Sequence, residues 1–471
     1  MPLLDLVVKN AKVWTQNGLI KGGIGVREDK ICTIANDYGL PAADKLIDAH
    51  GNLVIPGFVD EHVHFRDPYE GPRGDIATMR EDFATGTMAA AAGGVTTIIE
   101  MPDSFPLVVN AEAARAKLEV CRRKAYVDFG LHGGFMPGTD YTREIVNLYR
   151  LGLTGLKTYT CSFFSMPEWP ACYDGDLYNA LTVIGEIGAI ALLHAENEFI
   201  LSYNEKRLRD EGRTDLKAHL EWRTPLSEIE ADRRMIYFLK QTRARGLLVH
   251  TSVPEGVLET RTAREQGYEI YVETCPHFLF LTDEDLIRKG VWAKTAPPLR
   301  NRERVDEMWR LLNLGYVDTL GSDHTPYTKE EKIAAMQKPV WDAGNGVSSI
   351  EASLPLMMDA VNKHRTSLER VLEIACSNPA KLFGLYPRKG TLTVGADADF
   401  VIVDMKSKHK ISNDSTKSKC GWTLYDGMIT DGEPKMTFVR GSMIMQDGEI
   451  VGKEGFGQFV TRIDRESEVA T

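Results

Sequence analysis

The middle of the chain alternates short apolar runs with amphipathic segments, and this alternation restricts the possible folds more than any other property of the sequence. Eight runs follow one another in the order VIPGFVDEHVH, VTTIIEM, YVDFGLHG, GLTGLKTY, AIALLHAE, GLLVHTS, EIYVETCP and VDTLGSDH. Segments of helical period lie between them, such as AEAARAKLEVCRRK and EIEADRRMIYFLKQTRARG. Eight strand and helix units predict an α/β protein with a (β/α)8 barrel of the TIM type over residues 56–387. The functional site of such a barrel lies at the carboxyl ends of its strands.

The two ends of the chain have a different pattern. Residues 1–55 alternate apolar and polar residues between Gly and Asn turns, and the same pattern returns from Gly390 onward. Because chain ends often lie close together, residues 1–55 and 388–455 are predicted to pair into one small β-sandwich domain. Residues 456–471 have no strong periodicity and are predicted to form a C-terminal arm.

The composition restricts the kinds of partner that this protein can bind. A net charge of −11 opposes non-specific attraction to nucleic acid or to anionic lipid. No apolar run approaches the roughly 18 residues of a membrane helix, and the N-terminus has no signal-peptide layout. The seven cysteines include no CxxC pair and predict reduced thiols, of which Cys161 could line a pocket. We therefore expect a cytoplasmic protein that binds a small molecule, with no nucleic-acid or membrane partner.

Candidate metal ligands stand at the ends of the apolar runs. His62 and His64 form an HxH pair, and side chains two residues apart on a strand point the same way. This spacing is common by chance and is weak evidence alone. His194 and His250 each end an aliphatic run, where a single histidine is most often a hydrogen-bonded core residue. Asp323 ends the last run, and a carboxylate in that setting needs a metal or the role of a base. Five such residues at strand ends favour a metal site.

Lys157, at the end of the fourth run, is the unusual member of this series. A protonated lysine has only donors, but a neutral amine in a buried site can react with carbon dioxide to give a carbamate. That anion has two oxygens and can bridge two metals. The alternative is an ordinary anion-binding lysine. With the histidines and Asp323, a bridging carbamate would give a binuclear site that shares one hydroxide and lowers its pKa.

The order HxH, Lys, His, His, Asp between two β-segments resembles the amidohydrolase superfamily. It is similar in particular to the cyclic-amide branch of hydantoinases, dihydropyrimidinases, allantoinases and dihydroorotases. The supporting strings cover nearly the whole chain and include PGFVDEHVH, ETCPH, KTAPPLR, DTLGSDH and NPAKLFGLYPRKGTLTVGADADFVI. The strings IIEMP, HAENE, AGNG, LPLMM and GFGQFVTR resemble the hydantoinase group that includes the bacterial L-hydantoinase.

This resemblance implies a zinc enzyme that opens a hydantoin or dihydropyrimidine ring to an N-carbamoyl amino acid by means of a metal-bridging hydroxide. Two zinc ions per subunit are implied, the buried one held by His62 and His64 and the more exposed one by His194 and His250. N6-carboxylated Lys157 would hold both ions. Asp323 would ligate the buried ion and act as the base that passes a proton to the leaving ring nitrogen. The resemblance also implies a homotetramer.

Three further positions are expected to contact substrate. Asn345 matches the position whose backbone meets the ring amide, and Ala296 stands where relatives often have a serine. Ser162 stands five residues after Lys157, where dihydropyrimidinases and D-hydantoinases have a tyrosine that hydrogen-bonds the developing oxyanion. Aromatic residues of the same loop are candidates for a substrate wall or for an interface, namely Phe163, Phe164, Trp169 and Tyr173.

Arg66 follows HVHF, as does the arginine that grips the substrate carboxylate in dihydroorotases. The asparagine of the dihydroorotase MPN string is Asp103 here, and an acidic side chain disfavours an anionic substrate. The alternative is that Arg66 pairs with Asp67 or Glu70.

Other functions stay open at this point. Allantoinase and then dihydroorotase are the alternatives within the branch. A non-catalytic scaffold is the alternative outside it, because relatives that have lost metal ligands serve as assembly proteins. A metal site needs its full set of ligands, and all six are present, which favours an enzyme.

Overall fold

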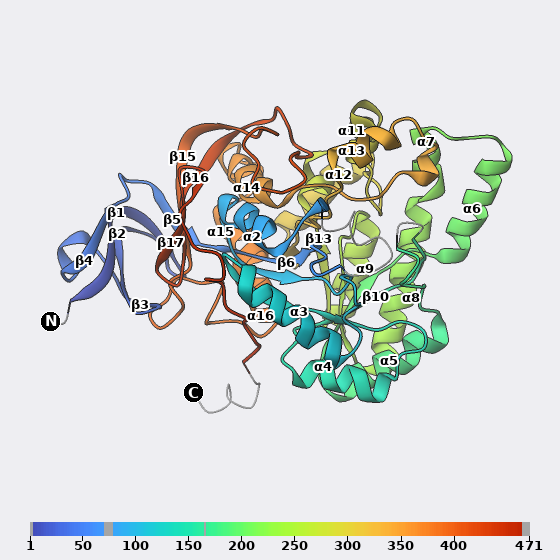
Figure 1. Cartoon of the computed structure of the whole chain (residues 1–471), viewed down its shortest axis with the longest axis horizontal. Coiled ribbons are helices and arrows are strands. Elements are labelled where there is room, and N and C mark those ends of the chain that lie inside the picture. The colour runs from blue at the N-terminus through green and yellow to red at the C-terminus, as the bar shows by residue number, and fades with distance from the viewer. Residues whose placement is uncertain (1–2, 70–78, 164–165, 464–471) are drawn as a thin grey trace.

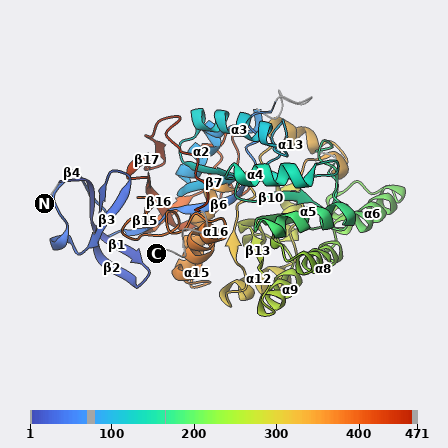
Figure 2. The ribbon, with the colours of Figure 1, turned by 90° about the horizontal axis from the view of Figure 1, so that it is seen from below.

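A computed structural model describes residues 3–69, 79–163 and 166–463 of the chain. Figures 1 and 2 show a barrel surrounded by helices, with a β-domain at the end of the molecule opposite α6 (Glu198–Asp210). The predicted fold class is confirmed: the chain combines a TIM-type barrel with a β-domain built from both chain ends.

The barrel strands correspond to the eight apolar runs of the sequence. They are β6 (Phe58–Val63), β7 (Val95–Glu100), β8 (Asp128–Leu131) with its short continuation β9 (Gly133–Gly134), β10 (Leu156–Tyr159), β11 (Ile190–His194), β12 (Arg245–Leu248), β13 (Ile270–Thr274) and β14 (Thr319–Leu320). Every residue of β6, β7, β10 and β11 is buried, as expected for parallel strands covered by helices.

Neighbouring strands of the barrel are parallel, and two links complete the ring. Strands β6 to β8 form one sheet and β9 to β14 another, with only His132 between β8 and β9. On the other side, the backbone N–H of His64 donates to the carbonyl of His324 at 2.9 Å. This hydrogen bond joins the end of β6 to the segment after β14 and brings the first and last strand ends together.

Helices follow the strands and cover the barrel. They are α2 (Phe83–Ala92), α3 (Ala111–Lys124), α4 (Val146–Arg150), α5 (Asp174–Glu186), α6, α7 (Leu216–Trp222), α8 (Pro225–Thr242), α9 (Pro254–Glu265), α10 (Pro276–Phe280), α11 (Asp283–Lys289), α12 (Arg302–Asn313), α13 (Lys329–Ala335), α14 (Ser353–Asn362), α15 (Leu368–Leu372) and α16 (Asn378–Leu382). Helix α12 shows why these segments are helical. Asn301 caps its first turn, and Val305, Met308 and Leu312 form a buried stripe at helical spacing.

Strands from both chain ends form one nine-stranded sheet. Its members are β1 (Leu4–Thr15), β2 (Gly18–Arg27), β3 (Lys30–Ala35), β4 (Ala43–Asp48), β5 (Leu53–Pro56), β15 (Phe400–Lys410), β16 (Ile429–Val439), β17 (Ser442–Gln446) and β18 (Glu449–Ile450). The antiparallel pair β5 and β15 joins the two ends. Val13 and Val54 from the first end share a core with Phe400 and Phe438 from the second.

Two late segments pack on the barrel. Between β15 and β16, Trp422 and Tyr425 are buried in a cluster with Phe278 and Leu356. Near the C-terminus, the backbone around Val460 hydrogen-bonds to Phe129 of β8. The described part of the predicted C-terminal arm therefore lies against the barrel of its own chain.

Buried charges join the β-domain to the barrel. The amine of Lys389 is fully buried and contacts Asp128 of β8, with Asp397 at 2.9 Å and Asp399 at 2.7 Å. Arg440, which follows β16, contacts the same Asp128 at 3.1 Å. Such a cluster is stable only when each charge keeps its partners.

Two further sequence features can be compared with the structure. All cysteines are free, and all except Cys32 are buried. Among the helices that the structure describes, none is long and apolar enough to cross a membrane.

Candidate active site

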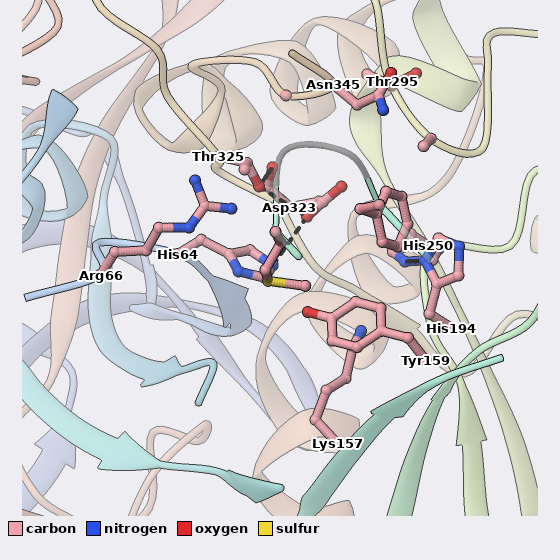
Figure 3. Close-up of a pocket in the computed structure, with 14 residues that line it drawn as sticks. His64, Arg66, Lys157, Tyr159, His194, His250, Thr295, Asp323, Thr325 and Asn345 are labelled. Carbon is pink, nitrogen blue, oxygen red and sulfur yellow. Dashed lines mark hydrogen bonds and ion pairs between the residues drawn. The ribbon is translucent and has the colours of Figure 1, made fainter. Parts of the chain in front are cut away.

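The strand ends bring all six predicted metal-site residues together. His62 lies in β6 and His64 directly after it, Lys157 lies in β10, and His194 ends β11. His250 and Asp323 follow β12 and β14. All of them except His62 line one pocket of about 490 Å³, and Figure 3 shows their side chains converging there.

His62, His64 and Asp323 form one half of the site. The Nε2 atoms of His62 and His64 both lie 3.4 Å from Oδ1 of Asp323. One ligand atom from each of the three residues lies within 4.8 Å of the others. Two imidazole nitrogens and a carboxylate oxygen are a donor set that zinc accepts.

His194 and His250 form the second half. Nδ1 of His194 faces Nε2 of His250 at 2.8 Å. Only one of two facing imidazole nitrogens can carry a proton between them. When neither does, both lone pairs face the same space and can bind one cation. Nδ1 of His250 is buried and has no hydrogen-bond partner among the described residues.

Lys157 lies between the two halves with its amine buried and without a hydrogen-bond partner in the described part of the chain. Burial lowers the pKa of this amine to about 8, against the opposing effect of nearby carboxylates, chiefly Glu273. An unpartnered amine of lowered pKa fits the neutral form that carbon dioxide attacks. The donor set as a whole therefore fits two metal ions with a carboxylated lysine between them.

Carboxylates behind the histidines fix which ring nitrogens face the site. Nδ1 of His62 contacts Oε1 of Glu273 at 2.7 Å, and Nδ1 of His64 contacts Oδ1 of Asp103 at 2.8 Å. Nε2 of His194 contacts Oε2 of Glu196 at 2.9 Å. Each contact holds the opposite nitrogen toward the metal position.

The roles of Glu196, Glu273 and Asp103 behind the histidines were missed by sequence reasoning. A signal was present for two of them, because Glu196 and Glu273 stand at the ends of apolar runs in HAENE and YVETCP. Carboxylates are rarely fully buried without a partner.

Asp323 has a left-handed backbone conformation and a lowered pKa, two properties that are common at functional sites. Its φ is 47° and that of His250 is 41°, in the left-handed region that non-glycine residues rarely occupy. Burial alone would raise the pKa of Asp323, but the histidines His62, His64 and His250 hold it well below its usual range. The carboxylate is therefore ionised and available as a ligand or as a base.

Comparison with known proteins agrees with this geometry. Residues 53–450 match the Amidohydrolase family. The chain is 37% identical to the L-hydantoinase of Paenarthrobacter aurescens over 99% of its own length and 100% of that protein. This chain belongs to the amidohydrolase family. It is also 33% identical to the allantoinase of Solibacter usitatus over 96% of both chains.

A solved structure supports the same placement. The L-hydantoinase (dihydropyrimidinase) from Arthrobacter aurescens superposes with a TM-score of 0.92, covering 98% of this chain and 100% of that one at 37% identity. The predicted resemblance to the hydantoinase branch of the amidohydrolases is confirmed.

Asn345 and Ala296, which the sequence analysis expects to contact substrate, both line the pocket of this amidohydrolase, and Figure 3 shows Asn345 on the wall opposite Lys157. Two buried lysines hold the loop of Asn345. Nζ of Lys294 donates to the carbonyl of Ala343 at 2.6 Å, and Nζ of Lys332 donates to that of Gly346 at 2.8 Å. Neither lysine has an ion pair within the described residues; Lys332 also donates to the carbonyl of Val291 at 2.9 Å and so ties the loop to that segment.

Arg66 lines the pocket and pairs with Asp103, whereas Asp67, one of its two expected partners, points elsewhere. Nε of Arg66 donates to Oδ2 of Asp103 at 2.7 Å. Asp67 instead accepts from the backbone N–H of Phe83 and from Lys124, which direct it toward the start of α2. Glu70 lies outside the described residues. Asp103 therefore contacts both Arg66 and His64 through its two carboxylate oxygens.

The predicted contact through Ser162 does not fit the structure either. Ser162 is exposed and is not among the described residues that line the pocket, because its backbone N–H is held outside by Glu198 at 2.7 Å. Phe163 of the same loop does line the pocket.

The other residues singled out in this loop lie elsewhere. Trp169 is buried, and Tyr173 stacks on Phe199 at the surface. Cys161 is buried but does not line the pocket. Phe164 lies outside the described residues.

Proposed function

We propose that this amidohydrolase hydrolyses a cyclic amide or imide bond and opens a hydantoin or dihydropyrimidine ring to an N-carbamoyl amino acid. The observation that carries the proposal is the convergence of three histidines, Asp323 and an unpartnered buried Lys157 on one pocket, with His62 beside Asp323. The identity to hydantoinases over nearly the full chain supports the substrate class.

Six side chains would hold the metal ions. His62, His64 and Asp323 would hold one ion, His194 and His250 the other, and N6-carboxylated Lys157 would contact both. Two zinc ions, when bound, supply polarisation of a carbonyl and a lowered pKa for water. Metal identity and carboxylation of Lys157 are part of the proposal.

Asp323 would move the proton. Its carboxylate accepts a proton from the attacking water and delivers it to the ring nitrogen that leaves. The low pKa of Asp323 keeps it ionised before the reaction. Asn345 and its backbone orient the ring from the opposite wall.

The charge of the pocket supports a neutral ring. Asp103 compensates the charge of Arg66, so an anionic ring such as dihydroorotate gains little from this arginine. Phe163 and Met166 add apolar surface to the same pocket. A hydantoin with an apolar substituent fits this lining.

Allantoin is the second candidate. The terminal nitrogens of Arg66 make no hydrogen bond to the described residues and can donate to the carbonyl of the ureido substituent that allantoin carries on its ring. Identity to allantoinases supports this alternative.

Initial rates of ring opening by the zinc-loaded protein test the proposal. The panel contains 5-substituted hydantoins of both hands, dihydrouracil, allantoin and dihydroorotate, with Asp323→Asn as the inactive control. We expect a hydantoin or dihydrouracil to give the highest kcat/KM. A preference for allantoin would select the second candidate, and a preference for dihydroorotate would contradict the neutral-ring argument.

We further propose a homotetramer. Exposed apolar side chains lie on the packed helices α5, α6 and α8, namely Tyr178, Phe199, Tyr203, Leu226 and Tyr237. Apolar surface of this kind favours association. Light scattering after size-exclusion chromatography tests this, and a monomeric mass would contradict it.

A further inference from the structure

Tyr159 is a buried aromatic residue at the metal end of the pocket that none of the assignments above uses. It ends β10, two residues after Lys157, and it is 5% exposed. Its ring packs edge-on against Trp169 at 5.4 Å and against Phe163 at 5.6 Å between centroids. The ring of His194 lies 5.6 Å away. Packing therefore fixes the ring without help from the hydroxyl.

The hydroxyl of Tyr159 has no hydrogen-bond partner among the residues that the structure describes, and it is open to the pocket that Tyr159 lines. Figure 3 shows this hydroxyl pointing away from the backbone of β10 and into the pocket. A phenol is protonated at neutral pH, so this hydroxyl can donate a hydrogen bond to a molecule bound in the pocket.

The other hydroxyls near the pocket are already hydrogen-bonded or lie away from Lys157. Thr325 already donates to Asp323 at 3.1 Å. Thr295 lies on the opposite wall beside Asn345, as Figure 3 shows. Ser162 is exposed outside the pocket. Tyr159 is next to Lys157, whose amine lies 5.0 Å from its ring centroid. Its hydroxyl is thus at the end of the pocket where the reacting carbonyl must lie.

We propose that Tyr159 is a catalytic residue whose hydroxyl donates a hydrogen bond to the oxygen of the ring carbonyl under attack. The inference rests on the proposed ring-opening function. Water oxygen bonds to the carbonyl carbon, the C=O π pair moves to the oxygen, and Asp323 takes one proton of the water. When the C–N bond breaks, that pair returns to re-form C=O, and the nitrogen receives the proton from Asp323. The Tyr159 hydroxyl stabilises the negative charge between these two events.

The test compares wild type with Tyr159→Phe, both zinc-loaded and full length, on the preferred ring of the wild type. Loss of one donor to an oxyanion lowers kcat by roughly 10²- to 10³-fold. We expect that fall in kcat with KM changed less than about fivefold, because the bond strengthens in the transition state. Affinity for the N-carbamoyl product, measured by calorimetry, should change less than kcat.

Tyr173→Phe is the matched control. It removes a hydroxyl from the connection that follows β10 and leads to α5, and its ring lies at the surface against Phe199. We expect wild-type kcat for this control. Zinc content and the unfolding midpoint of Tyr159→Phe should equal those of wild type.

Three outcomes would overturn the inference about Tyr159. These are a kcat within about threefold of wild type, a loss of zinc, and a loss of stability large enough to explain the fall in rate. A wild-type protein that opens no ring would instead overturn the proposed function, so the two failures are distinguishable.

Discussion

At the scale of single residues, the site depends on which nitrogen of each histidine faces the pocket. Glu273 and Asp103 occupy Nδ1 of His62 and His64, which leaves both Nε2 atoms near Asp323. Asp103 has a second task, because it also compensates Arg66. One carboxylate thus orients a ligand and sets the charge of the pocket.

Replacement of Asp103 by Asn should change both properties. The amide keeps the shape but loses the charge that orients His64, so metal affinity or activity on neutral rings should fall about 10- to 100-fold. Arg66 then becomes an uncompensated cation, and the rate on dihydroorotate relative to hydantoin should rise. Kinetics on both rings and zinc titration measure this. Asp342→Asn, at an exposed position, is the control. An unchanged ratio of the two rates would contradict the charge argument.

Replacement of Asp323 by Ala should stop turnover and leave the fold intact. Loss of a general base lowers the rate by about 10²- to 10⁴-fold, and loss of a metal ligand adds to this. Steady-state rates and circular dichroism measure activity and fold. Substantial residual activity would rule out Asp323 as the base.

At the scale of elements, parallel strands deliver the metal-site residues and loops deliver the substrate wall. This difference explains which residues of the site could be predicted from the sequence. A residue at the end of an apolar run must lie at the mouth of the barrel, so His194, His250 and Asp323 could be placed from the sequence alone.

Residues in loops could not be placed by this rule, because a loop does not fix the direction of its side chains. Ser162 turns outward because Glu198 of α6 holds its backbone, a contact that spacing from Lys157 does not reveal. The partner of Arg66 follows β7 and is 37 positions away in sequence, whereas reasoning from the sequence looked among near neighbours. Long-range contacts of this kind also place residues 411–428 on the barrel.

The loop of Asn345 gives a prediction at this scale. Lys294→Met removes the donor to the carbonyl of Ala343 while keeping the length of the side chain. Burial lowers the pKa of Lys294 well below its usual range and favours the neutral amine, whose hydrogen bond contributes about 0.5–1.5 kcal/mol. A loosened loop should therefore raise KM by roughly 2- to 10-fold. We expect kcat to change less than KM.

Lys338→Met is the control for this variant, because Lys338 is exposed on the segment that precedes the same loop. Steady-state kinetics of both variants decide the question. An unchanged KM in Lys294→Met would show that the loop does not need this lysine.

At the scale of the whole molecule, the two chain ends complete a domain that is joined to the barrel through buried charge. Lys389 contacts Asp128 of the barrel and Asp399 beside β15, and its side chain is 0% exposed. The pairing of the two ends was predictable from their shared strand pattern. The charged contact was not, because the sequence does not show which carboxylates meet one lysine.

Lys389→Met should therefore destabilise the fold. Its removal leaves buried carboxylates without their cation, which costs about 3–5 kcal/mol of the free energy of unfolding. Lys30→Met is the matched control, since Lys30 also contacts Asp397 but its side chain is 44% exposed. We expect less than about 1 kcal/mol for that control. Urea unfolding measures both, and equal effects would contradict the role of the buried cluster.

Metal content measured against activity tests the central claim most directly. The protein is stripped with a chelator and reloaded with zinc in steps, and bound zinc per subunit is compared with the rate of opening of a 5-substituted hydantoin. The two-ion site predicts no turnover in the metal-free protein and a rate that reaches its maximum only as two ions bind. Full turnover without metal, or with one ion, would contradict it.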